Sequence, residues 1–383
     1  MMMGRRGRLS GRSGRCPDLS GGLSMIDGLD DMLASSGQPG LPELRAVLRE
    51  LIGGLGPTAR VVDQRRLKPR VYRLRVEASG CVRSLVLKRL EPTVAQRNQL
   101  VAKRWLPAMG LSEAGPPLLG VAAARNGGWV WHVYDDLGDC TLDTCAADRR
   151  GVEAAVEVIA QLHTRSAGHP LLPECRLYGG DLGMPFYTAN VRDAIHSLES
   201  LQPSAVELSP ERVALRDRLL ARLHQRLDEQ SYRARAMAEL GGPEVLLHGD
   251  LWTTNMLVCS AEDGLRVRLI DWDHAGVGPI SYDLSTLLYR FPPADRHWLL
   301  DGYRGSLEHL GWRLPSVADL NLLFATAEWA RWANRVIWPA LAAVEGHQAA
   351  WAFDELAFVE QWCELMTPVL PHEETAEKPC QHD

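Results

Sequence analysis

Residues 246–258 read LLHGDLWTTNMLV, and they place ionisable and amide side chains inside an apolar segment. The stretch begins with two leucines and ends with Met-Leu-Val, which predicts buried backbone on both sides. Between these flanks stand His248, Asp250 and Asn255. Burying such groups without partners costs several kcal/mol each, about 2–7 for a neutral amide. They are therefore either satisfied by neighbours or exposed in a cleft where they do chemistry.

A β-hairpin is predicted directly downstream. The runs 256–260 and 265–270 have strand character, and the Asp-Gly pair in AEDG between them favours a tight turn. If 260 pairs with about 265, then 256 pairs with about 269. Asn255 and Asp271 then lie side by side at the open end of the hairpin, about 4.5–5.5 Å apart.

Further carboxylates are predicted at the same end of this hairpin. Asp250 lies on the loop that enters it, and Asp273 follows Asp271 by two positions. Hard oxygen ligands favour Mg²⁺ over Zn²⁺, and Mg²⁺ held by one or two side chains and a phosphate is typical of phosphoryl transfer. Asp250 is then free to orient an attacking hydroxyl. Each motif by itself is more often a turn or a strand end, but their combination at this spacing favours a site.

Length and composition restrict the class of protein. The chain of 383 residues is long enough for two lobes, and its net charge of −6 gives no electrostatic case for nucleic acid. The 8 cysteines are scattered without a C-x-x-C pair, which favours reduced thiols in a cytoplasmic protein. No run of about 18 apolar residues predicts a membrane span. The basic segment 1–24 and the tail 367–383 are expected to be disordered, and translation is expected to start at Met25.

The order of predicted elements indicates an α+β fold. The pattern favours a helix within 27–55, a hairpin around Ser79–Gly80, a helix over 95–110 and a strand over 129–134. After 141 it is mostly helical, with one long helix over 209–242, strands over 245–272 and helices over 281–366. We therefore expect a small antiparallel-sheet N-lobe over 25–136 and a mainly helical C-lobe over 137–366.

The motif HGDLWTTN, followed by LIDWDHAGVGPISYDLSTL, resembles the signature of small-molecule kinases of the aminoglycoside phosphotransferase and choline kinase type. The resemblance covers roughly residues 60–340 and implies a bilobal protein-kinase-like fold. HGD in place of H-R-D-L, DWD in place of D-F-G and the lack of A-P-E disfavour a protein kinase. The implied activity is transfer of the ATP γ-phosphoryl group to a small-molecule alcohol, with ATP and Mg²⁺ as cofactors.

The resemblance also assigns roles in the C-lobe. Asp250 is the implied catalytic aspartate, and Asn255 and Asp271 are the implied Mg²⁺ ligands. His248 is expected to brace the catalytic loop, and Asp273 to support the metal side as a further carboxylate. Two other residues of the family pattern, Asp283 and His163, are expected to be structural.

In the N-lobe, SLVLKRL supplies Lys88 on a strand, where a kinase needs a lysine that reaches the ATP phosphates. An isolated strand lysine is usually a solvated edge residue, but the alternating leucines around it favour the functional reading. The segment VYDDLG, 133–138, lies where the family holds adenine through backbone groups. Asp135 and Leu137 are the expected contacts.

Two departures from the family pattern leave activity open. The segment RRLKPRVYRL, 65–74, contains no glycine where a phosphate-covering loop normally has several, although its Arg and Lys side chains could contact phosphate. The following helix lacks the glutamate that normally pairs with the strand lysine, and Asn98 or Gln99 is nearest to its place. A catalytically weak or inactive kinase-like nucleotide-binding or regulatory protein is therefore the alternative.

The acceptor and the oligomeric state are not determined by the sequence. Trp329 and Trp332 share a helix face, which fits either an aromatic wall for a sugar or quaternary ammonium, or core packing. Five acids near the C-terminus fit either an acidic pocket for a cationic aminoglycoside or solvated helix faces: Glu328, Asp354, Glu355, Glu360 and Glu364. Aminoglycoside, choline-like, sugar and other alcohol acceptors all remain open.

Overall fold

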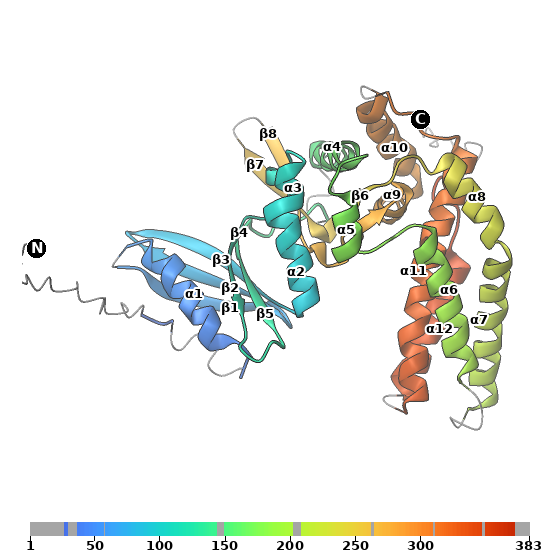
Figure 1. The fold of residues 1–383 in the computed structure, drawn as a ribbon, viewed down its shortest axis with the longest axis horizontal. Coiled ribbons are helices and arrows are strands. Elements are labelled where there is room, and N and C mark those ends of the chain that lie inside the picture. Colours follow the sequence, from blue (N-terminus) through green and yellow to red (C-terminus); the bar gives the residue numbers. More distant parts are fainter. Residues whose placement is uncertain are drawn as a thin grey trace, which may run out of the picture.

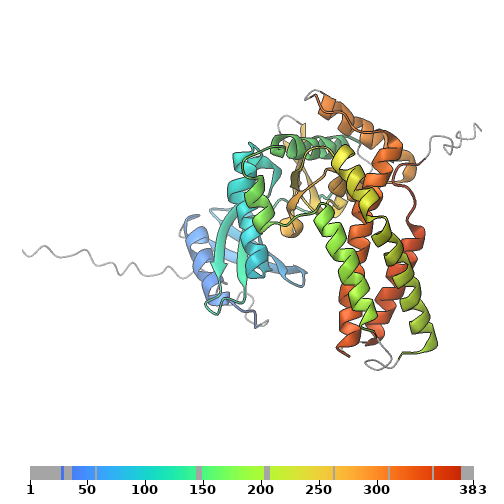
Figure 2. The ribbon, with the colours of Figure 1, turned by 45° about the vertical axis from the view of Figure 1, so that its right-hand side comes forward.

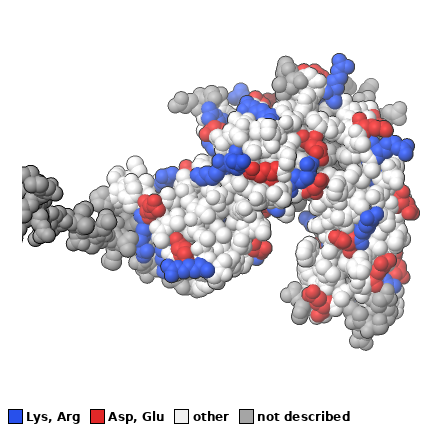
Figure 3. Space-filling view, in the orientation of Figure 1, with Lys and Arg blue, Asp and Glu red and all other residues white. Residues whose placement is uncertain are grey.

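The chain folds into two lobes, a small sheet lobe and a larger helical lobe, in a computed structural model (Figure 1). The structure describes residues 27–29, 37–56, 58–143, 149–201, 208–261, 264–308, 311–346 and 349–371. The basic segment 1–24, predicted to be disordered, lies outside these ranges. Basic and acidic side chains are interspersed over both lobes on the face in Figure 3. None of the helices described in the structure combines the length and apolar character that a bilayer span requires.

The N-lobe is built on a five-stranded antiparallel sheet in the order β1-β2-β3-β5-β4. The strands are β1 Arg60–Lys68, β2 Val71–Ala78, β3 Cys81–Leu90, β4 Leu118–Ala123 and β5 Val130–Asp135. The hairpin predicted around Ser79–Gly80 is confirmed, since Ala78 pairs with Cys81. Ser79 (φ 52°) and Gly80 (φ 80°) both adopt the left-handed conformation that two-residue hairpin turns favour.

One face of this sheet is covered by helix α1 (Leu41–Gly53). Its buried residues Leu44, Leu48 and Ile52 belong to one apolar cluster with residues of the sheet. The predicted helix within 27–55 therefore begins only at Leu41, directly after the left-handed Gly40. The other face of the sheet carries Lys88 and His132, which are directly opposed on β3 and β5. That face looks toward α2 (Pro92–Leu100), which continues through a π-helical turn (Val101–Trp105) into α3 (Leu106–Ala108).

The C-lobe is mainly helical, and α6, α7, α11 and α12 lie side by side as a bundle in both ribbon views (Figures 1 and 2). The helices are α4 Arg149–Ser166, α5 Leu172–Tyr178, α6 Met184–Glu199, α7 Pro210–Asp228, α8 Gln230–Leu240, α9 Ser281–Leu288, α10 Pro293–Glu308, α11 Val317–Val344 and α12 Ala349–Leu365. The single helix predicted over 209–242 is in fact two, α7 and α8, which meet at Glu229.

The tryptophans proposed as an aromatic wall belong to the helical core. Trp332 is fully buried, and its indole Nε1 donates to the carbonyl oxygen of Val359 at 2.8 Å. Trp329 packs edge-on against it with ring centroids 5.0 Å apart. The core-packing alternative is therefore correct for this pair.

Two expectations about the chain require correction. Residues 367–371 were expected to belong to a disordered tail, but Val369 and Leu370 are buried in the C-lobe core. The backbone of Leu370 exchanges two hydrogen bonds of 2.9 Å with the side chain of Asn321, so burial of apolar groups orders this segment. Thiols were all expected to be reduced, whereas Cys140 is disulfide-bonded.

Candidate active site

Two short ladders of the C-lobe hold the predicted site. The hairpin of β7 (Met256–Ala261) and β8 (Gly264–Leu269) has the predicted register, with Met256 opposite Leu269. The N–H of Ile270 also donates to the carbonyl oxygen of Asn255 at 2.9 Å, so Asn255 lies directly beside the backbone that leads to Asp271. In the second ladder, β6 (Val245–Leu247) pairs with β9 (Gly276–Gly278).

The loop that follows β6 is fixed by a buried carboxylate. Asp283 at the start of α9 accepts hydrogen bonds from the backbone N–H of His248 (2.8 Å) and of Gly249 (2.9 Å). Gly249 has φ +83°, and a Cβ there would lie 2.0 Å from the carbonyl oxygen of His274. Only glycine therefore fits where the loop 248–255, the predicted catalytic loop, passes the backbone of His274.

Asp283, His163 and His248 form a buried, hydrogen-bonded group beside this loop. Burial by itself raises the pKa of Asp283, but the hydrogen bond and charge of His163, together with His248, outweigh it and lower the pKa. His163 Nε2 lies 3.4 Å from the Asp283 carboxylate. His248 Nε2 lies 2.9 Å from the carbonyl oxygen of Ile270, and burial lowers the pKa of this ring, so it acts as a neutral brace between loop and hairpin.

Asp250, the predicted catalytic aspartate, is oriented by Asn255. The amide Nδ2 of Asn255 donates to the Asp250 carboxylate and to its carbonyl oxygen, both at 3.0 Å. A 3-10 turn over Thr253–Asn255 brings the amide back toward Asp250. Asn255 is buried, whereas Asp250 is only partly buried. The carboxylate is thus held in one orientation with a free side toward a cavity.

Asp271 and Lys88 meet across the two lobes. The ammonium Nζ of Lys88 lies 2.5 Å from Asp271 Oδ1, and these side chains are 16% and 33% exposed. Burial favours a neutral lysine, but the charges of Asp271 and Asp273 outweigh it and raise the pKa of Lys88. Asp271 has φ 66°, a conformation that costs a non-glycine residue about 1–2 kcal/mol. In this conformation its carboxylate contacts Lys88.

A second carboxylate replaces the helix glutamate that the sequence lacks. Asp273 Oδ1 lies 2.7 Å from Lys88 Nζ and accepts a hydrogen bond of 2.9 Å from the amide of Asn98 on α2. Arg97 on the same helix donates to the backbone carbonyl of Asp273. Asn98 was one of the two residues predicted nearest to the missing glutamate, and it acts on Lys88 through Asp273 rather than directly.

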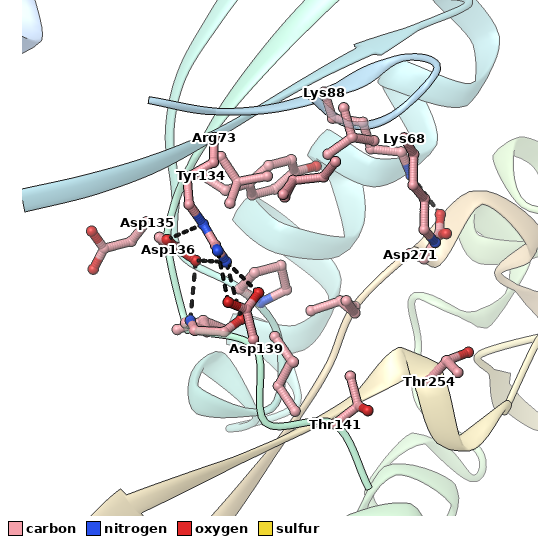
Figure 4. Close-up of a pocket in the computed structure, with 18 of the residues that line it drawn as sticks. Lys68, Arg73, Lys88, Tyr134, Asp135, Asp136, Asp139, Thr141, Thr254 and Asp271 are labelled. Atoms are coloured by element: carbon pink, nitrogen blue, oxygen red, sulfur yellow. Dashed lines mark hydrogen bonds and ion pairs between the residues drawn. The ribbon is translucent and has the colours of Figure 1, made fainter. Parts of the chain in front are cut away.

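The ion pair lies at one end of a cavity of about 310 Å³ between the lobes (Figure 4). Its walls are apolar on two sides: Leu67, Val71 and Val86 come from the N-lobe strands, and Leu257 and Ile270 come from the β7–β8 hairpin. Volume and lining are typical of a small-molecule or cofactor site. Two facing aliphatic walls suit a planar heterocycle.

The segment after β5 closes the other end of this cavity (Figure 4). Asp135 already has partners in the protein. Its N–H donates to the carbonyl oxygen of Pro117, and its carboxylate accepts a hydrogen bond of 3.1 Å from Arg83. Leu137 makes no hydrogen bond through its N–H or C=O to any described residue, so its backbone is available to a ligand. Of the two predicted adenine contacts, Leu137 has the free groups.

Arg73 on β2 fixes this segment, a role that sequence reasoning did not find. Its guanidinium lies 2.7 Å from the carboxylates of both Asp136 and Asp139. The hydrogen bond to Asp139 raises the pKa of Arg73, against its burial. No local pattern links a strand arginine to acids more than sixty positions away.

The glycine-free turn between β1 and β2 has only two residues, Pro69 and Arg70. Arg70 is paired with Glu91 at 3.2 Å. Lys68, at the end of β1, lines the cavity beside Lys88 and makes no ion pair or hydrogen bond through its ammonium among the described residues. Among the basic side chains of 65–74, Lys68 is therefore the one that we expect to contact phosphate.

A second cavity, of about 530 Å³, lies on the far side of the catalytic loop. Gly249, Asp250 and Trp252 line it, whereas Thr254 of the same loop lines the first cavity. The rest of its wall comes from α6, α9, α11 and α12, together with His274 and with Arg290 just after α9. Asp250 thus faces a chamber distinct from that of Lys88 and Asp271, with the loop as the partition.

Solved structures resemble this fold. A spectinomycin phosphotransferase crystallised with ADP and spectinomycin is 14% identical, with 84% of this chain and 95% of that chain covered and a TM-score of 0.50. A choline/ethanolamine kinase family protein from Mesorhizobium loti is 17% identical, with coverages of 84% and 96% and a TM-score of 0.49. An aminoglycoside phosphotransferase from Streptomyces rimosus, in complex with ADP and streptomycin, is 19% identical, with coverages of 76% and 99% and a TM-score of 0.46. The match to the spectinomycin phosphotransferase confirms the expected bilobal protein-kinase-like fold.

Sequence comparison identifies the family. No curated protein matches the chain. The model of the phosphotransferase enzyme family matches residues 63–319, well over half of the chain. The matched region contains Lys88 and both motifs on which the resemblance rested, HGDLWTTN and LIDWDHAGVGPISYDLSTL. The protein therefore belongs to the phosphotransferase enzyme family, and its prediction as a small-molecule phosphotransferase is confirmed.

Proposed function

We propose that this protein transfers the γ-phosphoryl group of ATP to a hydroxyl group of a small molecule. One observation carries the proposal: the catalytic loop divides two cavities, with Lys88 and Asp271 in the first and Asp250 in the second. A donor and an acceptor bound on opposite sides of one short loop are held ready for in-line transfer, and such positioning supplies much of the catalysis of phosphoryl transfer.

In this proposal the first cavity binds the nucleotide. The aliphatic walls hold the base, and the backbone of Leu137 offers it one donor and one acceptor. The phosphates then extend toward Lys88 and Lys68, whose ammonium groups lie at the other end of the cavity (Figure 4). Asp273 and Asn98 keep Lys88 in position for the phosphates.

The residues present fit a magnesium ion. Asn255 and Asp271 offer an amide oxygen and a partly exposed carboxylate, the hard oxygen donors that Mg²⁺ prefers beside phosphate. Among the described residues no three His, Cys, Asp or Glu side chains form a metal-binding cluster, so a closed zinc-type site is not the alternative there. When bound, the ion shields phosphate charge.

Asp250 orients the acceptor and receives its proton. The acceptor oxygen forms a bond to the γ-phosphorus while the bond from that phosphorus to the β–γ bridging oxygen breaks, and ADP leaves. The hydroxyl proton passes to the Asp250 carboxylate and then to solvent. Because a carboxylate is a weak base toward an alcohol, the proton moves late, after most of the phosphorus–oxygen bond to ADP has broken.

The test is Asp250→Asn, which preserves shape and removes the base. ADP release coupled to a panel of alcohols should fall by about 10²–10⁴-fold, the usual contribution of a general base. Calorimetric affinity for ATP with Mg²⁺ should stay at the level of the unaltered protein, because Asp250 does not line the nucleotide cavity. Asp301→Asn, on the exposed surface of α10, is the matched control.

The same measurements distinguish an active phosphotransferase from the inactive alternative. An unaltered protein that binds ATP and Mg²⁺ but releases no ADP with any alcohol is a nucleotide-binding relative without turnover. The replacement of the missing glutamate by Asp273 argues for an intact lysine site instead. Full activity of Asp250→Asn would refute the catalytic assignment.

A further inference from the structure

The second cavity carries an excess of positive charge. Its lining includes Arg290, Arg331 and Arg335, against only two carboxylates, Asp250 and Glu328. Arg331 and Arg335 are one helical turn apart on α11, and Arg290 lies two residues after the end of α9. These positively charged side chains therefore share a chamber with the proposed catalytic base.

One of the two carboxylates is already neutralised. Glu328 is buried, with its side chain 6% exposed, and it pairs with Arg331. The same Arg331 also donates to Ser285 Oγ at 3.0 Å and to the carbonyl oxygen of Tyr282. The protein thus occupies three of its five N–H donors, and the Glu328–Arg331 pair contributes no net charge to an acceptor.

Arg290 and Arg335 are different, because neither makes an ion pair or a hydrogen bond with any residue that the structure describes. Each instead stacks on an indole of the same cavity. The guanidinium carbon of Arg290 lies 3.9 Å from the ring centroid of Trp252, and that of Arg335 lies 5.4 Å from the ring centroid of Trp362. A cation–π contact of this kind uses no hydrogen-bond acceptor, so the guanidinium N–H groups stay free for an anion.

Of the five acids that were considered for a cationic pocket, Glu328 lines this cavity and is paired with Arg331, and the other four lie elsewhere. Glu360 pairs with Arg218 on α7 at 2.6 Å, and Glu364 pairs with Arg222 at 2.9 Å. Neither they nor Asp354 and Glu355 line the cavity. Because the pairing of Glu328 with Arg331 leaves it without net charge for a ligand, a cationic acceptor would meet the unpaired guanidinium groups of Arg290 and Arg335.

We propose that the acceptor is an anionic hydroxyl compound, whose carboxylate or phosphate group binds Arg290 and Arg335 while its hydroxyl is presented to Asp250. This inference rests on the proposed function and gives it a substrate class. The two arginines offset the repulsion between an acceptor anion and Asp250, and their fork of donors matches a planar carboxylate or a phosphate. Tyr282, Phe186 and Phe358 provide apolar wall for the carbon skeleton between the two ends.

A panel of compounds of similar size and different charge tests this substrate class. Glucuronate, glucose and glucosamine share a ring and most of their hydroxyls but differ in charge, and glucose 6-phosphate adds the phosphate form. Glycerate, glycerol and ethanolamine repeat the comparison at smaller size. We expect binding to the protein saturated with ADP and Mg²⁺ to be at least about tenfold tighter for the anionic member of a series than for its neutral and cationic members. Comparison of glucuronate with glucose 6-phosphate separates a carboxylate from a phosphate.

Two variants connect the selectivity to the arginines. Arg290→Gln and Arg335→Gln should each weaken binding of the anionic member about tenfold and leave the neutral member unchanged. Both side chains are exposed and unpaired, so the variants should fold, which a thermal unfolding scan verifies. Arg235→Gln, an exposed arginine of α8 outside the cavity, is the matched control.

Binding of the acceptor and phosphoryl transfer to it are measured separately. Selective binding of an anion that Arg290→Gln abolishes supports the proposal even if no ADP is released, in which case the proposed transfer fails and the charge selectivity stands. If no anionic member binds more tightly than its neutral counterpart, or if ethanolamine or glucosamine binds best and is indifferent to both substitutions, the proposal is overturned.

Discussion

Lys88 and Asp273 form an ion pair of 2.7 Å that joins the strand of one lobe to the segment after the hairpin of the other. Asn98 holds the same carboxylate oxygen at 2.9 Å, so helix α2 reaches the lysine through an intermediate carboxylate. An amide by itself would orient an ammonium only weakly, because it carries no charge. The arrangement supplies the missing charge from Asp273 and the missing helix contact from Asn98.

Removal of this carboxylate should weaken use of ATP. We expect Asp273→Asn to lower kcat/KM for ATP about 10–100-fold, since a hydrogen bond to a charged group contributes about 1.5–3 kcal/mol. Asn98→Ala should act in the same direction with a smaller effect, because Lys88 keeps its contact with Asp271. Gln99→Ala, on the exposed side of α2, serves as the control. Equal kinetics for Asp273→Asn and the unaltered protein would contradict the assignment.

Lys68 should contribute to phosphate binding without a glycine loop. In the proposed complex its ammonium is an unpaired cation at the phosphate end of the cavity. Lys68→Ala should raise KM for ATP about tenfold with a smaller change in kcat, as expected for loss of a charge-assisted contact. Steady-state kinetics with varied ATP provide the measurement. Lys103→Ala, an exposed lysine in the π-helical turn, should change neither constant, and an unchanged KM in Lys68→Ala would exclude the role.

Gly249 should be irreplaceable for steric reasons. In Gly249→Ala the new Cβ lies 2.0 Å from a backbone oxygen, and the residue must also adopt φ +83°. We expect the free energy of unfolding to fall by more than about 3 kcal/mol, measured by urea denaturation. Gly242→Ala carries the same left-handed strain (φ +72°) with open space around its Cβ, and should cost only about 1 kcal/mol. Similar losses in the two variants would show that backbone strain, and not the clash, dominates.

Stability should decrease in mildly acidic solution because of His132. Burial and, secondarily, the charge of Lys88 lower the pKa of His132 to about 4. The ring is fully buried, and its unfolded pKa is about 6.5. The unfolded chain therefore binds this proton first, so stability is complete above pH 6.5 and is lost as the pH falls toward 4, by up to about 3 kcal/mol.

Denaturation at several pH values between 7 and 4 checks this expectation. His132→Gln should flatten the dependence, and the exposed His196→Gln should not. The remaining slope includes His248, whose pKa burial also lowers. A dependence on pH that is equally steep in His132→Gln and in the unaltered protein would exclude His132 as the source.

The sequence by itself determined the local geometry of the catalytic hairpin. Strand pairing has a period of two and the Asp-Gly turn limits the loop, so the register that sets Asn255 beside the backbone of Asp271 follows from counting residues. The turn at Ser79–Gly80 follows in the same way. Lys88 was recognisable because the leucines on either side indicated which strand face is buried.

Only the tertiary structure decided which charges meet. Spacing along α11 indicates that Glu328, Arg331 and Arg335 share a face, but it does not indicate what that face opposes. Glu360 and Glu364 are neutralised by arginines about 142 positions earlier, and Asp273 is shared by a strand lysine and a helix amide. Charged side chains pair through space across elements whose packing is set by the apolar core. Whether the second cavity carries positive or negative charge therefore depends on how the helices assemble, which residue composition does not specify.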